Sequence, residues 1–375
     1  MKALCNRKRL LDAFGMVAGV VPARSPKPIL QNVKLVAEPD EGSILMATDL
    51  EVGIRSRVLG VKVDQPGAAI LPTQRMTQIL RTSSDEELMI EVDQDQLVVR
   101  GLRSEFKLPS EDPDLFPEVP DFALPAFHVL AAGDLRRGIL RTMFATDPES
   151  TRYALGGVLV EPADGQMTLV GTDGRRLARM IIPTEAEGAP GPYSPAPVIP
   201  VKALKLIEKN LADEDDKGPV HLGVQSGSAV LIRIPGKSVI YSRLVEGRFP
   251  RYQDVFPGSV DVKIPMECGT LRLAVEQASI VTSDESRGVD FSFGQGRLKL
   301  NSKAADVGSS FVEMPIPYDG KDVEITFDPR YLIDALKTLD DDAVVTAELI
   351  DHKSAAVFKT DDQYTYVVMP LTRDR

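Results

Sequence analysis

Apolar residues recur along the chain in three similar series, each of which predicts the same order of elements. In each series, apolar positions three or four residues apart predict an amphipathic first helix, over residues 7–20, 133–146 and 269–282. A second helix, introduced by proline, follows in each series, and the three align without a gap on residues 71–80, 199–208 and 327–336. Equivalent apolar positions of these helices are held by Met76, Leu204 and Leu332, which are spaced by 128 residues. The pattern therefore predicts an internal threefold repeat.

A predicted hairpin of two alternating strands closes each series. The strand pairs are 88–92 with 96–100, 220–224 with 229–233, and 345–349 with 355–359. Each repeat is then an α+β unit of about 120 to 130 residues. Prolines mark linkers from Pro109 to Pro125 and from Pro250 to Pro265, and the predicted domains are residues 1–122, 126–253 and 258–375. The proline-rich run 183–200 falls inside the middle repeat, as a loop before its second helix.

The composition excludes several classes of protein. Cys5 and Cys268 are too few for a disulfide framework, which indicates a reducing cytoplasm. The first residues contain no apolar stretch that would predict a signal peptide or a membrane helix. The three histidines lie far apart and outside any metal-ligand spacing, and no phosphate-binding glycine loop or hydrolase motif is present. We therefore expect no cofactor, no metal and no catalysis.

Positive charge is concentrated on the predicted helices, although the chain carries a formal net charge of −11. Acidic residues instead collect in turns, as in 83–87, 213–216 and 340–342. Lys and Arg on the exposed face of a single helix would not indicate DNA binding, because most helices carry such residues there. Here the same feature recurs on equivalent helices of the repeats. If they face one direction, they form a basic wall that binds DNA phosphates without sequence preference and with a strong dependence on salt.

Three segments in this order, on a threefold repeat that covers essentially the whole chain, resemble one family. They are Thr172-Asp173-Gly174-Arg175-Arg176-Leu177-Ala178, then residues 244–252, then Tyr366-Val367-Val368-Met369-Pro370-Leu371. The family is the bacterial DNA polymerase III β subunit, the sliding clamps. The resemblance implies three clamp domains per chain and a head-to-tail homodimer whose six domains form a ring around duplex DNA. It further implies that the ring tethers the replicative polymerase, the clamp loader and other DNA-processing proteins.

The resemblance also assigns expected roles to residues of this chain. A pocket for partner peptides would comprise Leu155, Thr172, Gly174, Arg176, Leu177, Pro250, Val255, Tyr331, Val367, Met369, Pro370 and Leu371. Combined with the basic helices, it predicts DNA contacts from Arg24, Arg81, Arg136, Arg137, Arg141, Arg152, Tyr153, Lys202, Lys205 and Lys209. The subunit interface would join Phe106 and Leu108 of one chain to Ile280 and Val281 of the other. The sequence departs from the commoner family pattern at Ala154, Arg175 and the terminal residues.

Two other interpretations stay open at this point. The clamp fold could serve a monomeric adaptor that binds peptides and never encircles DNA, and ring closure is what distinguishes the two. An enzyme is the weaker alternative. Its one candidate carboxylate, Asp173, is flanked by Arg175 and Arg176, and such neighbours favour an ion pair over general acid catalysis.

Overall fold

The computed structural model describes residues 1–39, 42–93, 96–150, 154–191, 193–212, 218–260 and 262–371. The chain divides into two compact units, one made of residues 1–136 and 184–244, the other of residues 137–183 and 245–375. This division falls inside helix α3 (Ala132–Met143). The middle repeat therefore contributes strands to both units.

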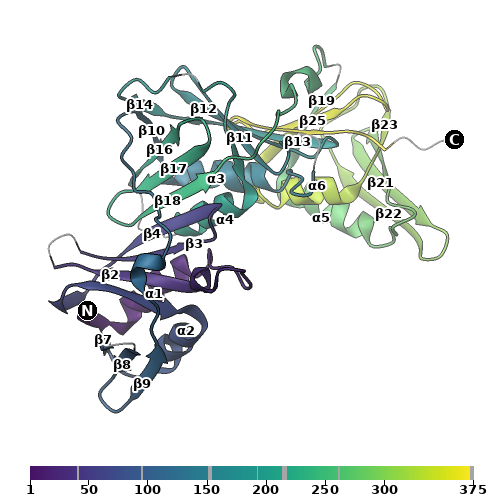
Figure 1. Ribbon diagram of the computed structural model, residues 1–375. Coiled ribbons are helices and arrows are strands. Elements are labelled where there is room, and N and C mark those ends of the chain that lie inside the picture. Colours follow the sequence, from purple (N-terminus) through teal and green to yellow (C-terminus); the bar gives the residue numbers. More distant parts are fainter. Residues whose placement is uncertain are drawn as a thin grey trace. The chain divides into compact units, whose positions relative to one another are not determined.

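Two antiparallel sheets form the first unit. The smaller has the strand order β5 (Val61–Gln65), β1 (Lys2–Asn6), β7 (Glu87–Asp93), β8 (Gln96–Arg100) and β9 (Glu105–Pro109). The larger has the order β14 (Glu185–Glu187), β10 (Phe127–Ala131), β16 (Pro219–Gln225), β17 (Ala229–Ile234), β18 (Ser238–Arg243), β4 (Val52–Val58), β3 (Ser43–Thr48), β2 (Asn32–Ala37) and β6 (Gly67–Pro72). Figure 1 shows β18 of the middle repeat beside β4 of the first, where Ile240 lies opposite Ile54. One continuous sheet thus joins the first two repeats.

Helices α1 (Arg7–Val17), α2 (Thr73–Thr82) and α4 (Val201–Asn210) pack their apolar faces on these sheets. Their buried side chains include Leu10, Phe14, Met76 and Leu204, and each such burial contributes about 1.5–3 kcal/mol. The remaining elements of the unit are the 3-10 helices η1 (Pro28–Gln31) and η2 (Pro113–Leu115) and the short strand β15 (Val198–Pro200), which leads into α4.

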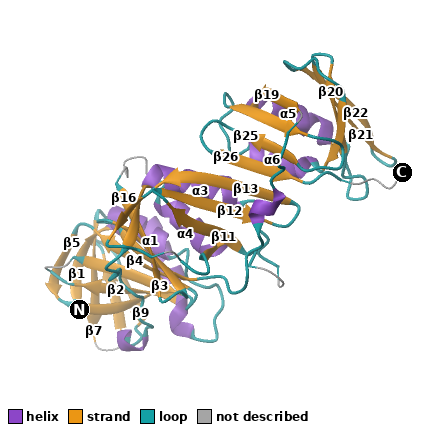
Figure 2. Cartoon of the chain, turned by 90° about the horizontal axis from the view of Figure 1, so that it is seen from above, coloured by secondary structure: helices purple, strands orange, loops and turns teal. Residues whose placement is uncertain are grey.

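The second unit repeats this arrangement. Its larger sheet contains, in order, β11 (Gly157–Ala163), β12 (Gln166–Thr172), β13 (Arg176–Pro183), β26 (Tyr364–Val368), β25 (Ala356–Lys359), β24 (Val344–Leu349) and β19 (Val262–Glu267). Its smaller sheet has the order β22 (Gly308–Pro315), β21 (Arg297–Ala304), β20 (Val289–Gly294) and β23 (Val323–Phe327). Figure 2 shows β13 beside β26, with α5 (Cys268–Ser279) and α6 (Pro329–Leu336) against the sheets of the last repeat. A short 3-10 helix, η3 (Tyr252–Val255), lies in the connection that precedes β19.

The predicted α+β class, the six helices and the three hairpins are confirmed in the described residues. Each first helix ends three residues earlier than predicted, because its last predicted turn is closed by bonds from residue i to i−3, such as Val20 N to Val17 O and Thr282 N to Ser279 O. The linker expected to reach Pro265 ends sooner, since Pro265 lies within β19. β19 is an edge strand, where a residue without an N–H group is tolerated.

Candidate functional site

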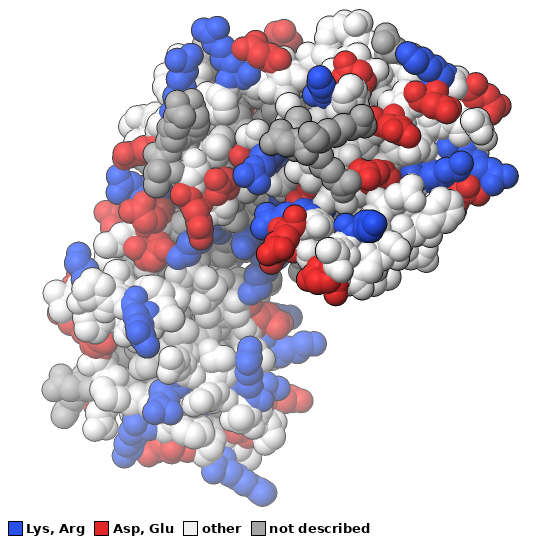
Figure 3. Space-filling model, turned by 90° about the vertical axis from the view of Figure 1, so that its right-hand side faces the viewer, with Lys and Arg blue, Asp and Glu red and all other residues white. Residues whose placement is uncertain are grey.

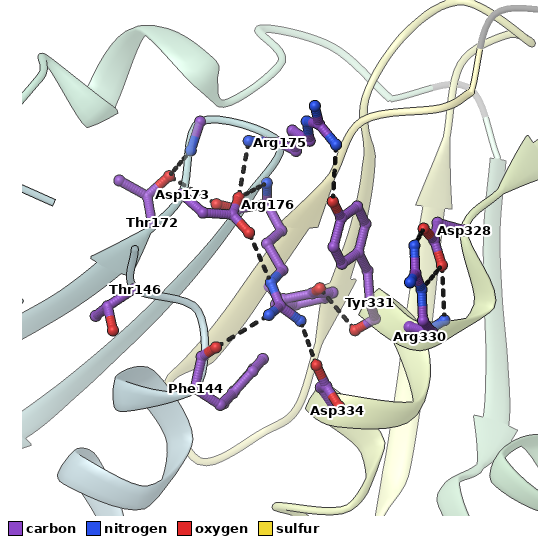
Figure 4. Close-up of polar contacts among 12 residues, drawn as sticks. Phe144, Thr146, Thr172, Asp173, Arg175, Arg176, Asp328, Arg330, Tyr331 and Asp334 are labelled. Carbon is purple, nitrogen blue, oxygen red and sulfur yellow. Dashed lines mark hydrogen bonds and ion pairs between the residues drawn. The ribbon is translucent and has the colours of Figure 1, made fainter. Parts of the chain in front are cut away.

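A tight turn between β12 and β13 forms the centre of the candidate site (Figure 4). The Thr172 hydroxyl donates to the Arg176 carbonyl at 2.6 Å and accepts from the Gly174 N–H at 3.1 Å. The Asp173 carboxylate accepts from the backbone N–H groups of Arg175 and Arg176, at 2.9 and 3.0 Å. Gly174 has φ of +85°, a conformation that glycine adopts without strain. The turn is therefore held rigidly by its own short polar side chains.

Arg176 connects this turn to helix α6. Its guanidinium donates to Asp173 at 3.1 Å, to Asp334 at 2.7 Å and to the carbonyl of Phe144 at 3.0 Å, and it lies 4.7 Å from the centre of the Tyr331 ring. Burial alone would lower the pKa of Arg176, but the hydrogen bond with Asp334 and the nearby negative groups outweigh it and raise the pKa. The predicted ion pair of Asp173 is confirmed.

Thr172 and Arg176, two of the predicted pocket residues, use their side chains for contacts within the chain. Thr172 donates to the Arg176 carbonyl, and Arg176 pairs with the carboxylates of Asp173 and Asp334. Sequence reasoning missed Asp334. The signal was its position three residues after Tyr331, which places both on one side of α6.

The strand register places three of the predicted pocket residues on one face of the sheet. Leu177 lies opposite Thr172 on one side and opposite Val367 on the other, and directly opposed residues project to the same face. Beyond β26, the N–H of Met369 donates to the Arg175 carbonyl at 2.9 Å, and the Met369 side chain is 42% exposed. The chain then continues through Pro370 to Leu371, whose N–H donates to the backbone carbonyl of Thr326 at 2.8 Å.

The other predicted pocket residues lie in the same unit. Leu155 is buried, Pro250 is half-buried and Val255 is 39% exposed. The Tyr331 hydroxyl accepts a hydrogen bond from the exposed Arg175 at 3.4 Å. Of the predicted apolar members, Leu155, Leu177 and Val367 are buried, whereas Val255 and Met369 are exposed. Exposed apolar side chains accompanied by a few polar groups are typical of a site that binds a peptide with apolar side chains.

The residues predicted to contact DNA differ in their exposure and in whether they form ion pairs or hydrogen bonds within the chain. Arg24, Arg81, Arg137, Lys202, Lys205 and Lys209 are exposed. Lys202 forms an ion pair with Asp49, Arg136 pairs with Glu208 at 2.9 Å, and the Lys209 ammonium donates to the carbonyl of Gly15 at 2.9 Å. Figure 3 shows acidic and basic side chains interspersed on the face that it views. Several of these cations thus already have acceptors within the chain.

Arg141 differs in its burial from the other described residues that are predicted to contact DNA. Arg141 is buried and forms an ion pair with Asp362, so it does not belong to an exposed basic face. Arg137 lies four residues earlier on the same helix and is exposed, so the helical spacing alone did not distinguish the two arginines. Arg152 and Tyr153 lie outside the described residues.

Two edge strands carry exposed apolar side chains. Phe106 on β9 is 36% exposed, and β9 is the outermost strand of its sheet. Ile280, just after α5, is 75% exposed, while Leu108 and Val281 are half-buried. Sequence reasoning missed Phe311, which is 62% exposed on the edge strand β22. The signal was its place directly after Ser309 and Ser310 in the sequence.

In the described residues, no helix is long and apolar enough to cross a membrane. The same part of the chain contains no group of three His, Cys, Asp or Glu side chains that could hold a metal ion.

Comparison with known proteins links these features to one family. The models of the N-terminal, central and C-terminal domains of the DNA polymerase III beta subunit match residues 1–120, 130–251 and 253–372. The chain is 30% identical over 368 residues to a beta sliding clamp of Pseudomonas aeruginosa, covering 98% of each protein. It is 31% identical over 372 residues to one of Chlamydia trachomatis, covering 99% of this chain and 87% of the relative.

Solved structures agree. A sliding clamp of Bartonella birtlesii bound to griselimycin is 30% identical, has a TM-score of 0.90 and covers 100% of both chains. A clamp from Bacillus subtilis has a TM-score of 0.91 at 23% identity, covering 100% of this chain and 99% of that one, which shows the shared fold. The chain belongs to the DNA polymerase III beta subunit family, the β sliding clamps.

Proposed function

We propose that two copies of this chain close head to tail into a ring around duplex DNA, and that each copy tethers the replicative polymerase, the clamp loader and other partners by a short peptide. As a member of the β sliding clamp family, the chain is a non-catalytic subunit whose partners are DNA and the polymerase. The proposal includes three clamp domains, formed by residues 1–122, 126–253 and 258–375. It also includes a cytoplasmic location.

The observation that carries the tethering role is the exposed apolar side chain of Met369, which follows β26 just beyond the buried pair Leu177 and Val367. Aliphatic and methionine side chains adapt to apolar anchors of different shapes, which suits a site with several partners. Griselimycin, bound to the Bartonella birtlesii clamp, is a ready probe for the same surface.

Peptide binding is the test of this role. A fluorescent peptide with the pattern Gln-Leu-x-Leu-Phe should bind the wild-type chain, a scrambled peptide should not, and griselimycin should displace the first. Met369→Asp should weaken binding by a factor of about ten or more, because the carboxylate would lose water on contact with an apolar ligand. The matched control is Leu59→Asp, which places the same charge at an exposed leucine in the turn after β4. Equal binding by Met369→Asp and Leu59→Asp would contradict the proposed pocket.

Ring closure is supported by the two edge strands. The outer edges of β9 and β22 have no neighbour within their sheets, so each can pair with a strand of another copy. Phe106 and Leu108 on one copy, with Ile280, Val281 and Phe311 on the other, supply the apolar contacts of that pairing. A monomeric adaptor would leave both edges and their apolar side chains in water, which makes it the weaker proposal.

DNA binding is proposed to rest on the exposed cations Arg24, Arg81, Arg137, Lys202, Lys205 and Lys209, with the half-buried Arg136. The family resemblance adds Arg152 and Tyr153. Arg141 is left out because it is buried. Such contacts bind phosphates and therefore carry no sequence preference.

A further inference from the structure

The connection between the middle and last repeats is fastened along its length to the sheet of the second unit. We refer to residues 247–256 as the strap. At its beginning, the N–H of Ala154 donates to the Arg248 carbonyl at 3.3 Å. At its end, η3 packs Tyr252 against Phe256, with their ring centres 6.5 Å apart.

Two side-chain contacts hold η3 to the sheet. The Tyr252 hydroxyl donates to the carboxylate of Glu161 on β11 at 2.8 Å. The guanidinium of Arg179 on β13 lies 4.5 Å from the centre of the Phe256 ring, within the range of a cation–π contact. Tyr252 is buried, and burial together with Glu161 raises its pKa to about 12, so the hydroxyl keeps its proton and remains a donor at neutral pH.

These anchors lie on the same face of the sheet as the candidate pocket. Arg179 is opposite Thr365, as Leu177 is opposite Val367, and both pairs alternate along β13 and β26 with the residues of the other face. Arg179 also donates to the Thr365 hydroxyl at 3.3 Å. The strap therefore crosses the sheet next to the row of apolar pocket residues.

The strap itself carries two of the predicted pocket residues, Pro250 and Val255. Val255 is 39% exposed, whereas Tyr252, within the same short helix, is 6% exposed. The buried tyrosine fixes the position from which the exposed valine is presented. A wall fixed before binding strengthens affinity, because no conformational entropy has to be lost when the ligand arrives.

We propose that Tyr252, Glu161 and Arg179 are positioning residues for partner binding, because they hold the strap where Pro250 and Val255 complete one wall of the pocket. The inference rests on the proposed peptide-binding function. None of the three needs to touch the peptide. Their effect is transmitted through the strap alone.

Conservative variants test this inference in the full-length chain. Tyr252→Phe removes the hydroxyl and keeps the ring, and it should weaken binding of the Gln-Leu-x-Leu-Phe peptide about tenfold, since hydrogen bonds to charged groups are among the stronger ones. Glu161→Ala should have the same effect, and Glu161→Gln, which keeps an acceptor, should restore most of the affinity. The double variant Tyr252→Phe with Glu161→Ala should be no weaker than either single variant. The matched control is Tyr318→Phe, whose hydroxyl donates to the Lys321 carbonyl in an exposed loop.

Hydrogen exchange separates positioning from general destabilisation. Amides of residues 247–256 should exchange faster in Tyr252→Phe, while amides of β12 and β13 stay as protected as in the wild type. If Tyr252→Phe is too unstable to assay, Glu161→Ala, which removes the acceptor of the same hydrogen bond, supplies both measurements. If the wild type, Tyr252→Phe and Glu161→Ala all bind the peptide equally well, the inference is wrong and the proposed pocket is not affected. A wild type that does not bind the peptide overturns the proposed function itself.

Discussion

Arg141 on α3 forms an ion pair with Asp362, which lies in the turn between β25 and β26 and follows it by 221 residues. The guanidinium also lies 5.6 Å from the centre of the buried Tyr364 ring. One buried arginine thus joins the first helix of the middle repeat to the last hairpin of the third. Its contacts are structural, although Arg137 on the same helix is exposed.

Removal of this arginine should destabilise the second unit. We expect Arg141→Met to lower its free energy of unfolding by about 2–3 kcal/mol, below the ~3–5 kcal/mol typical of a fully buried pair, because Asp362 is 41% exposed and stays partly hydrated. Urea denaturation measures the change. Arg297→Met breaks an exposed pair with Glu313 and should change stability by no more than about 1 kcal/mol. Equal effects of the two substitutions would contradict the buried role of Arg141.

The same pair predicts a dependence on pH. Burial would raise the pKa of Asp362, but hydrogen bonds from Thr360 and Arg141 outweigh it and hold the pKa below its ordinary value. A carboxylate with a lowered pKa in the folded state stabilises the fold above its unfolded pKa of about 3.9 and loses this effect as pH falls through the folded value. Asp362→Asn should therefore differ most from the wild type at pH 5 to 7. The difference in urea midpoint should shrink below about pH 4, and a difference that stays constant to pH 3 would refute this account.

Lys205 should contribute more than Lys202 to DNA binding. Lys202 already has a counter-charge in Asp49, so it releases fewer ions when it meets a phosphate. We expect Lys205→Gln to reduce the slope of log affinity against log salt by about 1, and Lys202→Gln to reduce it by less. Asp49→Asn should raise affinity, and Lys62→Gln, on the edge strand β5, serves as the control. A larger effect of Lys202→Gln than of Lys205→Gln would show that DNA displaces Asp49.

Glycine should be required at position 174 because of its backbone conformation. It is not required to avoid a steric clash with neighbouring atoms. An added Cβ would meet no atom within 4 Å, but φ of +85° disfavours other residues by about 1–2 kcal/mol. Gly174→Ala should therefore lower stability by about that amount, as measured by thermal unfolding. Gly133→Ala is the matched control, since Gly133 is helical and equally open, and it should be neutral or slightly stabilising. Equal loss of stability in both variants would contradict a special backbone requirement at Gly174.

Ring closure should fail when an edge strand carries a new charge. Phe106→Arg and Phe311→Arg should each give monomers in light scattering and lose retention on circular DNA, because each places an arginine in an apolar contact between copies. Peptide binding should persist in both. Leu115→Arg, at an exposed leucine outside the sheets, is the control. Retention of DNA by a proven monomer would rule out the ring and favour the monomeric adaptor.

The repeat, the helices and the hairpins follow from the sequence alone. Apolar spacing of three or four residues, proline before the second helices and alternation in the strands are local signals, and they locate these elements within a few residues. The family could also be predicted, because its short segments recur in order along a chain of the right length. Local periodicity does not require knowledge of what an element packs against.

Only the tertiary structure distinguished residues that look alike in the sequence. Arg137 and Arg141 share a helix and a charge, yet one is exposed and the other is buried against Asp362. From the sequence, Arg176 is a candidate for ligand binding, but its guanidinium N–H groups donate to Asp173 and Asp334. In each case the deciding partner is brought close by strand pairing and helix packing between distant segments. The role of the side chain depends on that partner. The local sequence pattern does not predict which distant residue will lie close to it in space.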